Sequence, residues 1–152
     1  MKAIGIKMVD LQPMRASMAL QTGYAIGYSH PDDMGYEVTY PDGYKSWSPK
    51  DAADAAYFPI ADETGSKIMV EDLNNFIVRG EGIRLGEKTT VVLDTTITGF
   101  DTLGTSACVD PTNYNQEIGN AIARKDIDDK IWGHLGFVLQ WAKNGLKFKA
   151  KK

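Results

Sequence analysis

The chain has 152 residues, of which 43% are hydrophobic and 24% are charged, and its formal net charge is −3. This composition is that of an ordinary globular protein and excludes a disordered chain. The single cysteine, Cys108, excludes a disulfide within the chain. No run of residues reaches the roughly 18 apolar residues of a membrane span, and the N-terminal MKAIGIKMV is too short an apolar stretch for a signal peptide. We therefore expect no membrane partner and a place in the cytoplasm.

The N-terminal part, residues 1–60, is expected to form a small antiparallel sheet with a short helix. Turn formers and apolar alternation predict a strand over 3–11, a loop over 24–33, a β-hairpin of 35–40 and 44–47, and a helix over 49–56. Asp42 and Gly43 supply the hairpin turn, and Ser48 is the expected helix cap. Pro, Gly and small polar residues cluster over 58–67, which predicts a domain boundary there.

A second domain is predicted over residues 68–145, followed by a lysine-rich tail over 146–152. Val70, Leu73 and Ile77 lie on one face of a predicted helix that ends at Gly80. Residues 80–86 are expected to be a loop, because their glycine spacing does not fit a dinucleotide-binding turn. Short strands are predicted over 89–93, 95–98 and 106–109, with Asp94 and residues 100–104 as breaks. The expected class is α+β, with small antiparallel sheets.

A long C-terminal helix, or a helical hairpin, is the strongest local prediction. Asp110 is a capping residue, Pro111 suits the first helical position, and Asn144-Gly145 supplies the stop. An apolar stripe follows that start: Ile118, Ile122, Ile127, Ile131, Leu135, Val138 and Ala142. A straight helix of this length spans roughly 50 Å, more than a small domain. It must therefore bend near Gly133 and Gly136 or pack against the same helix of another subunit, and apolar groups on its other sides favour a homo-oligomer.

The run TSACVDPTNYNQEIGNAIARKDIDDKIWGHLGFVL, residues 105–139, resembles the ending of the small accessory-protein family shared by phages N4 and Sf6. The resemblance covers roughly residues 70–140 and includes the TTVVL segment before that run. A second segment, DGYKSWSPK over residues 42–50, is similar to a phage module that ends in a segment like Ala56-Tyr57-Phe58-Pro59. These resemblances imply a phage protein that acts in the cytoplasm of the infected bacterial host.

The resemblances also imply a function. The ending is similar to that of Thoeris anti-defence proteins, in which two subunits form a pocket that holds a host immune nucleotide without cleaving it. The expected partner is therefore a small-molecule nucleotide second messenger, either a cyclic ADP-ribose isomer or a cyclic oligonucleotide. The residues offer no convincing general acid–base pair and no set of metal ligands, so the chain is expected to be neither an enzyme nor a holder of a cofactor or metal.

Candidate binding residues are cations for phosphate, flat rings for a base and an amide near a helix start. They are Phe100, Asn113, Tyr114, Arg124, Lys130 and Arg84. We expect the pocket where the turn over 99–103 meets the first turns of the C-terminal helix, completed by a neighbouring subunit. Phe100 would stack the base and Arg124 would neutralise phosphate.

Other chemistries are less favoured by the residues. Cys108 and His134 could be drawn as a nucleophile and its base, but the apolar strand context of Cys108 favours an inert thiol. Asp126, Asp128 and Asp129 are expected to form surface ion pairs with cations four residues away rather than a metal site. The alternative function is an accessory protein that binds a host protein or nucleic acid, although a pI near 5.3 speaks against nucleic acid as the partner. The third hypothesis is a hydrolase that acts on the same nucleotides.

Overall fold

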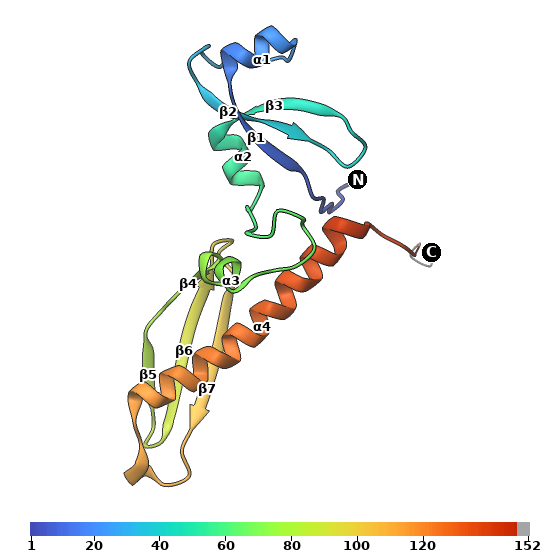
Figure 1. Cartoon of the computed structure of the whole chain (residues 1–152). Helices are drawn as coiled ribbons and strands as arrows, with labels where there is room; N and C mark the ends of the chain where they lie inside the picture. The colour runs from blue at the N-terminus through green and yellow to red at the C-terminus, as the bar shows by residue number, and fades with distance from the viewer. Residues whose placement is uncertain (149–152) are drawn as a thin grey trace. The chain divides into compact units, whose positions relative to one another are not determined.

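The computed structural model describes residues 1–148, which fall into two compact units (Figure 1). The first unit contains Met1–Pro59 and the segment that begins at Gln140, and the second contains Ile60–Leu139. Each unit has its own antiparallel sheet and its own hydrophobic core. The predicted α+β class is confirmed. The predicted tail begins inside the described residues at Leu146, but Lys149, Lys151 and Lys152 lie outside them.

The first unit is a sheet of three antiparallel strands in the order β1-β2-β3, with two short helices. Its elements are β1 (Asp10–Arg15), α1 (Ala16–Thr22), β2 (Met34–Thr39), β3 (Lys45–Pro49) and α2 (Lys50–Ala56). The first strand lies later than the predicted 3–11. It continues through Pro13, because an edge strand tolerates a proline. Helix α1 was not predicted, since only Ala16 and Ala19 are buried on it and Gly23 ends it after two turns.

The DGYKSWSPK segment is explained by the fold of this unit. The predicted hairpin is confirmed: Gly43 has a φ of +84°, and the Asp42 carboxylate accepts the amide hydrogen of Tyr44 at 3.0 Å. Trp47 is buried and its indole nitrogen donates to the carbonyl of Met14 at 2.9 Å. A Cβ on Gly35 would lie 2.5 Å from the Trp47 ring, so the facing strand needs glycine there. The segment therefore builds a turn and a core.

The second unit is a sheet that the long helix covers on one face. Its elements are α3 (Val70–Phe76), β4 (Ile77–Val78), β5 (Gly82–Leu85), β6 (Thr89–Thr96), β7 (Asp101–Ala107), a 3-10 turn (Pro111–Asn113) and α4 (Gln116–Asn144). β7 pairs along one edge of β6, while β4 and β5 pair with the two ends of its other edge. β4 and β5 are thus one lane of the sheet, interrupted at residues 79–81.

Several predicted strand and helix ends in this unit were wrong for one reason. Asp94 does not break a strand but lies buried within β6, because an ion pair from Arg79 neutralises it. Gly104 also lies inside a strand, β7. A Cβ there would come within 2.0 Å of the Ala123 carbonyl oxygen of α4, so this glycine serves helix packing and does not end the strand. Ile77 belongs to β4 rather than to the preceding helix, and the predicted loop over 80–86 contains β5. Partners distant in the sequence decide each case.

Helix α4 is a single helix that continues through Gly133 and Gly136, so neither the predicted break nor the helical hairpin occurs. Its start differs from the prediction: Asp110 caps the 3-10 turn, accepting the amide hydrogen of Thr112 at 2.9 Å, and α4 begins only at Gln116. Its end is as predicted, with Gly145 at a φ of +63°. Among the described residues, no helix combines the length and apolarity needed to cross a membrane.

The buried stripe of α4 is Gly119, Ala123, Ile127, Ile131 and Leu135, which packs on Val92 of β6 and on Leu73 and Ile77. Three residues of the predicted stripe are instead exposed: Ile118 at 60%, Ile122 at 54% and Val138 at 40%. The small residues of the true stripe let the helix approach the sheet closely, so the contact runs through them. The pattern of hydrophobic residues alone does not show that the buried face of α4 contains Gly119 and Ala123.

The loop before α3 depends on an ionised carboxylate. Asp62 accepts hydrogen bonds from the amide and hydroxyl of Ser66, both at 2.8 Å, and from the Thr64 hydroxyl at 2.8 Å. These bonds, that of the Ser66 amide first, hold the pKa of Asp62 well below its ordinary value. Because the folded-state pKa is the lower one, the stability it contributes is complete above the unfolded value near ~3.9 and is lost as the pH falls toward the folded value.

We therefore expect Asp62→Asn to flatten the acid dependence of stability. Between pH 7 and 5 the variant should be less stable than the parent by a constant amount, and below about pH 4 this difference should shrink. Urea unfolding midpoints across this range measure it. Parallel curves for the two proteins down to pH 2.5 would show that the carboxylate bonds do not act in this way.

Candidate functional site

A small pocket lies where the first turn of α4 meets β6 and β7. Its cavity volume is about 70 Å³. The side chains around it come from the end of the β5–β6 turn, the two strands, the 3-10 turn and the helix. They are Lys88, Thr90, Ser106, Ala107, Cys108, Asn113, Tyr114, Asn115, Ile118, Gly119 and Ile122. The pocket thus combines polar groups and one cation with the exposed apolar side chains of the helix.

Tyr114 is held firmly at this pocket. Its hydroxyl lies 3.0 Å from the hydroxyl of Thr90 and donates to the side-chain carbonyl of Gln116. The Arg84 guanidinium lies over its ring, 4.2 Å from the centroid, and donates to the carbonyl of Glu87. A stacked guanidinium keeps its planar N–H groups at the edge, where they can meet phosphate or carboxylate oxygens. Arg84 and Tyr114 therefore form an oriented cation–aromatic pair.

The floor of the pocket requires close contact between helix and sheet. The Ser106 hydroxyl donates to the carbonyl of Gly119 at 2.8 Å. A Cβ on Gly119 would lie 2.2 Å from the Thr90 hydroxyl oxygen, so only glycine lets the helix start this near to β6. Asn115 accepts the amide hydrogen of Ile118 at 3.0 Å and caps the helix. The helix start is thus fixed against both strands.

The pocket is positive on its sheet side. Lys88 lines it and Arg84 stacks on its lining residue Tyr114, and within residues 1–148 neither cation is paired with a carboxylate. The first turn of α4 adds the positive end of a helix dipole. Such a place favours an anion such as a phosphate group. Three predicted residues, Arg84, Asn113 and Tyr114, meet here.

The other predicted residues lie elsewhere in the unit. Phe100 is exposed in the β6–β7 turn, with its ring 5.8 Å from that of His134 and edge-on to it. That turn lies beside the second half of α4 and not beside its first turns, because the helix runs antiparallel to β7. Lys130 donates to the carbonyl of Leu103 and to Asp126, both at 2.7 Å. A pocket that joins all six residues is therefore not formed within one chain.

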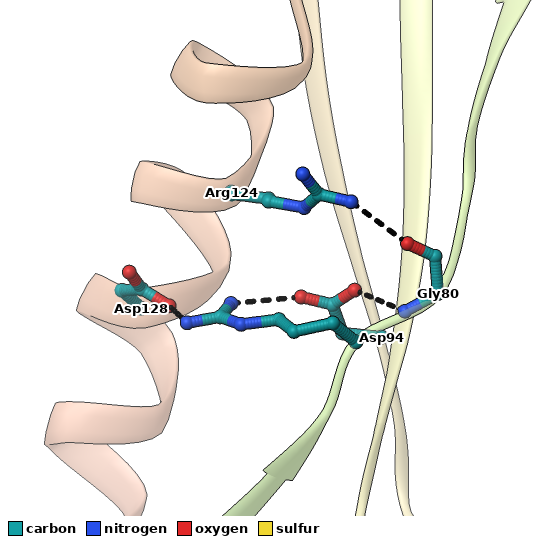
Figure 2. Close-up of polar contacts among 5 residues, drawn as sticks. Gly80, Asp94, Arg124 and Asp128 are labelled. Atoms are coloured by element: carbon teal, nitrogen blue, oxygen red, sulfur yellow. Dashed lines mark hydrogen bonds and ion pairs between the residues drawn. The ribbon is translucent and has the colours of Figure 1, made fainter. Parts of the chain in front are cut away.

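Arg124 belongs to a polar network between α4 and the sheet (Figure 2). It donates to the carbonyl of Gly80 at 2.9 Å, and the Gly80 amide donates to Asp94 at 2.8 Å. Arg79 joins Asp94 at 2.8 Å to Asp128 of the helix at 2.7 Å. Asp128 thus pairs with Arg79 rather than with Arg124, its predicted partner four residues away. Arg124 holds the interrupted strand, so we expect its replacement to lower stability.

This network is the polar cluster that sequence reasoning missed. Burial lowers the pKa of Arg79, but the ion pairs with Asp94 and Asp128 outweigh burial and hold that pKa above its ordinary value. The Asp94 side chain is only 1% exposed, so it depends on these partners. The one sign of this cluster in the sequence is Asp94, an aspartate in the middle of a strongly apolar strand pattern. The cluster fixes the sheet to the helix, and within it the buried Arg124 Nε has no hydrogen-bond partner among residues 1–148.

Cys108 and His134 do not form a pair within one chain. Cys108 follows the last residue of β7, and its sulfur lies 3.2 Å from the Asp110 carbonyl oxygen. His134 contacts Phe100, which precedes the first residue of that strand. The seven residues of β7 separate the two ends by roughly 23 Å. Within residues 1–148, no group of three His, Cys, Asp or Glu side chains is placed to hold a metal ion.

The segment that builds this unit matches a known family. Residues 52–142 match the model of the phage protein (N4 Gp49/phage Sf6 gene 66) family. The chain belongs to this family. Neither a curated protein nor a solved structure matches the chain. The N4 Gp49/Sf6 gene 66 match confirms the resemblance seen in the C-terminal run, and it contains the whole pocket, whereas the DGYKSWSPK segment precedes it.

Proposed function

We propose that this N4 Gp49/Sf6 gene 66 protein is a phage counter-defence protein that binds and sequesters a host immune signalling nucleotide without cleaving it. The ligand is a cyclic ADP-ribose isomer or a cyclic oligonucleotide. The binding place is the pocket at the start of α4. The observation that carries the proposal is the Arg84–Tyr114 pair beside Lys88, since oriented cations and a fixed ring suit a phosphate next to a base.

The size of the pocket adds a second element to the proposal. A cavity of about 70 Å³ is far smaller than the ~300–1,000 Å³ of pockets that enclose drug-sized ligands. It admits a phosphate group or the edge of a base, and the rest of the ligand needs a further wall. Ile118 and Ile122 lie exposed at its rim, and an apolar rim is a surface that a second copy of the chain would cover. A homo-oligomer therefore completes the site.

Isothermal titration calorimetry with cyclic ADP-ribose isomers and with cyclic di- and trinucleotides tests the proposal. Arg84→Ala should weaken binding about ten- to a hundredfold, because a charge-assisted hydrogen bond contributes ~1.5–3 kcal/mol. The matched control is Arg15→Ala, which removes an exposed arginine from β1 of the other unit and should leave affinity unchanged. Recovery of intact nucleotide after heating the complex checks that it is held and not cleaved.

The outcomes separate the proposal from its alternatives. Absence of binding to every nucleotide by the intact protein would overturn it and favour an accessory protein that contacts a host protein through the Ile118–Ile122 rim. Binding followed by release of a cleaved nucleotide would indicate a hydrolase. Equal losses for Arg84→Ala and Arg15→Ala would place the ligand elsewhere on the chain.

A further inference from the structure

Two hydroxyl groups, those of Thr90 and Ser106, form the floor of the pocket at the start of α4. A Cβ on Gly119 would lie 2.2 Å from the Thr90 hydroxyl oxygen and 3.3 Å from the Ser106 hydroxyl oxygen, so the two oxygens surround one point. Ser106 donates its hydrogen to the carbonyl of Gly119 at 2.8 Å. A hydroxyl has one hydrogen and two lone pairs, so Ser106 offers only lone pairs to a ligand.

The neighbours of Tyr114 decide which way the Thr90 hydroxyl points. The hydroxyl oxygens of Thr90 and Tyr114 lie 3.0 Å apart, a contact in which either could donate. Tyr114 gives its one hydrogen to the side-chain carbonyl of Gln116. The Gln116 amide nitrogen donates to the side-chain carbonyl of Asn120 at 2.9 Å, which turns the Gln116 carbonyl toward Tyr114. Thr90 is therefore the donor to Tyr114, and its oxygen also has only lone pairs left.

The floor of the pocket thus consists of acceptors without a donor. Within residues 1–148, no hydrogen bond that we find is accepted by the Thr90 or the Ser106 oxygen once these directions are assigned. The Cys108 thiol at the same pocket is committed as well, because it donates to the carbonyl of Asp110 at 3.2 Å. Thr90 is only 1% exposed, and a buried acceptor without a donor is unfavourable. Solvent can supply a donor in the free protein, and a ligand that displaces solvent must replace it.

We propose that the part of the ligand that enters this pocket is a hydrogen-bond donor, a ribose hydroxyl or the exocyclic amine of a purine, and not the phosphate. A phosphodiester has only acceptor oxygens, and the lone pairs of the floor repel them. Its place is at the side chains of Arg84 and Lys88, which only donate. The inference rests on the proposed function for the presence of a nucleotide, and it adds which group of that nucleotide the floor selects.

Gln116 is the positioning residue of the floor. It does not line the pocket, but its carbonyl takes the Tyr114 hydrogen and so sets the direction of the whole chain of bonds. Gln116→Leu removes that acceptor, so Tyr114 can donate to Thr90, and the Thr90 hydrogen can turn into the pocket. Gln116→Glu keeps an acceptor for Tyr114. The first variant should lose the preference for a donor, and the second should keep it.

Nuclear magnetic resonance titration of the isotope-labelled full chain with small probes tests the inference. Adenosine at up to about 10 mM, which detects millimolar affinity, should shift the amide signals of Thr90 and Ser106. Purine riboside lacks the exocyclic amine, and 2′-deoxyadenosine lacks one ribose hydroxyl. One of the two should bind at least about fivefold more weakly than adenosine, and that analogue identifies the donor. Sulfate, which has no hydrogen to donate, should shift the side-chain signals of Arg84 and Lys88 and leave Ser106 nearly unchanged.

Matched variants connect the result to the floor. Thr90→Val keeps the shape of the side chain and removes its oxygen, so it should abolish the difference between adenosine and the weaker analogue. Thr105→Val makes the same replacement on the exposed side of β7 and should preserve that difference. Circular dichroism checks that each variant is folded, and the two Gln116 variants test the same point without altering the floor itself.

Several results would overturn the inference. They are equal affinity for the three nucleosides, no shift of Thr90 and Ser106 with adenosine, a larger sulfate effect at Ser106 than at Arg84, and an unchanged preference in Thr90→Val or Gln116→Leu. Calorimetry with the cyclic nucleotides tests the proposed function separately. If none of them binds while adenosine behaves as expected, the proposed function fails and the donor requirement of the pocket stands. If they bind while adenosine leaves the floor unshifted, the reverse holds.

Discussion

Ile131→Asp is expected to unfold the second unit. Ile131 is 1% exposed and packs in the core with Ile127, Leu135 and Leu73. A carboxylate there has no cation to pair with in this cluster, and burying it costs several kcal/mol, on top of the lost apolar contacts. Because a domain of this size is stabilised by about 5–15 kcal/mol in total, the loss removes much or all of the folded population. Thermal unfolding followed by circular dichroism measures it.

The matched control is Ile122→Asp, the same replacement in the same helix. Ile122 is exposed, so the new carboxylate stays hydrated and the unfolding temperature should fall by only a few degrees. The helix propensity lost in the two variants is the same, and the difference between them reports burial alone. Similar unfolding temperatures for the two variants would contradict the assignment of Ile131 to the core stripe.

Gly104→Ala is expected to separate α4 from the sheet. The added methyl carbon would lie 2.0 Å from the Ala123 carbonyl oxygen and 2.8 Å from a side-chain carbon of Ile127. Backbone cannot rotate away as a side chain can, so the helix must shift as a body. Overpacking of this kind costs about 1–3 kcal/mol and here adds the loss of the packing around Ala123. Urea unfolding should show a lower midpoint.

Gly133→Ala in α4 is the control with the opposite sign. A Cβ on Gly133 meets no atom within 4 Å, so the change gives only the helix propensity of alanine, worth about 1 kcal/mol. The two variants carry the same substitution and should move the urea midpoint in opposite directions. A stabilised Gly104→Ala protein would show that helix and strand are farther apart than the structure has them.

Local chemistry made part of this fold predictable from the sequence. The hairpin turn at Asp42 and Gly43 and the helix stop at Gly145 each depend on a backbone conformation that their own residues favour. Asp94 shows the limit of such reasoning. An isolated aspartate looks like a strand break, and only the guanidinium of Arg79, which the fold brings from the interruption between β4 and β5, makes it a strand residue. Gly104 also looks like a strand break, and only the nearby Ala123 carbonyl of α4 explains why a glycine stands inside β7.

The candidate site was predictable to a similar extent. Asn113 and Tyr114 follow the Asp110-Pro111 start signal closely, so their place beside the helix start could be inferred from the sequence. Arg84 reaches them because β5 pairs with β6, but β5 was hidden in a glycine-containing stretch expected to be a loop. Phe100 was wrongly predicted to lie beside them, because neither the α4 segment nor the β7 segment alone determines the direction of the helix relative to the strand. Pairing and direction are properties of the assembled sheet.

The network around Asp94 also constrains how this sequence can diverge. Removing Arg79 alone leaves the buried Asp94 carboxylate without a cation, at a cost of about 3–5 kcal/mol. Removing Asp94 alone leaves Arg79 paired with Asp128 but takes away the acceptor of the Gly80 amide. Replacing both by apolar residues of similar volume can be close to neutral. The easy evolutionary route therefore passes through joint substitution, and the identities at 79, 94 and 128 should vary together among relatives. The interrupted lane of the sheet is thus expected to be inherited together with three side chains, one from the interruption itself, one from β6 and one from α4.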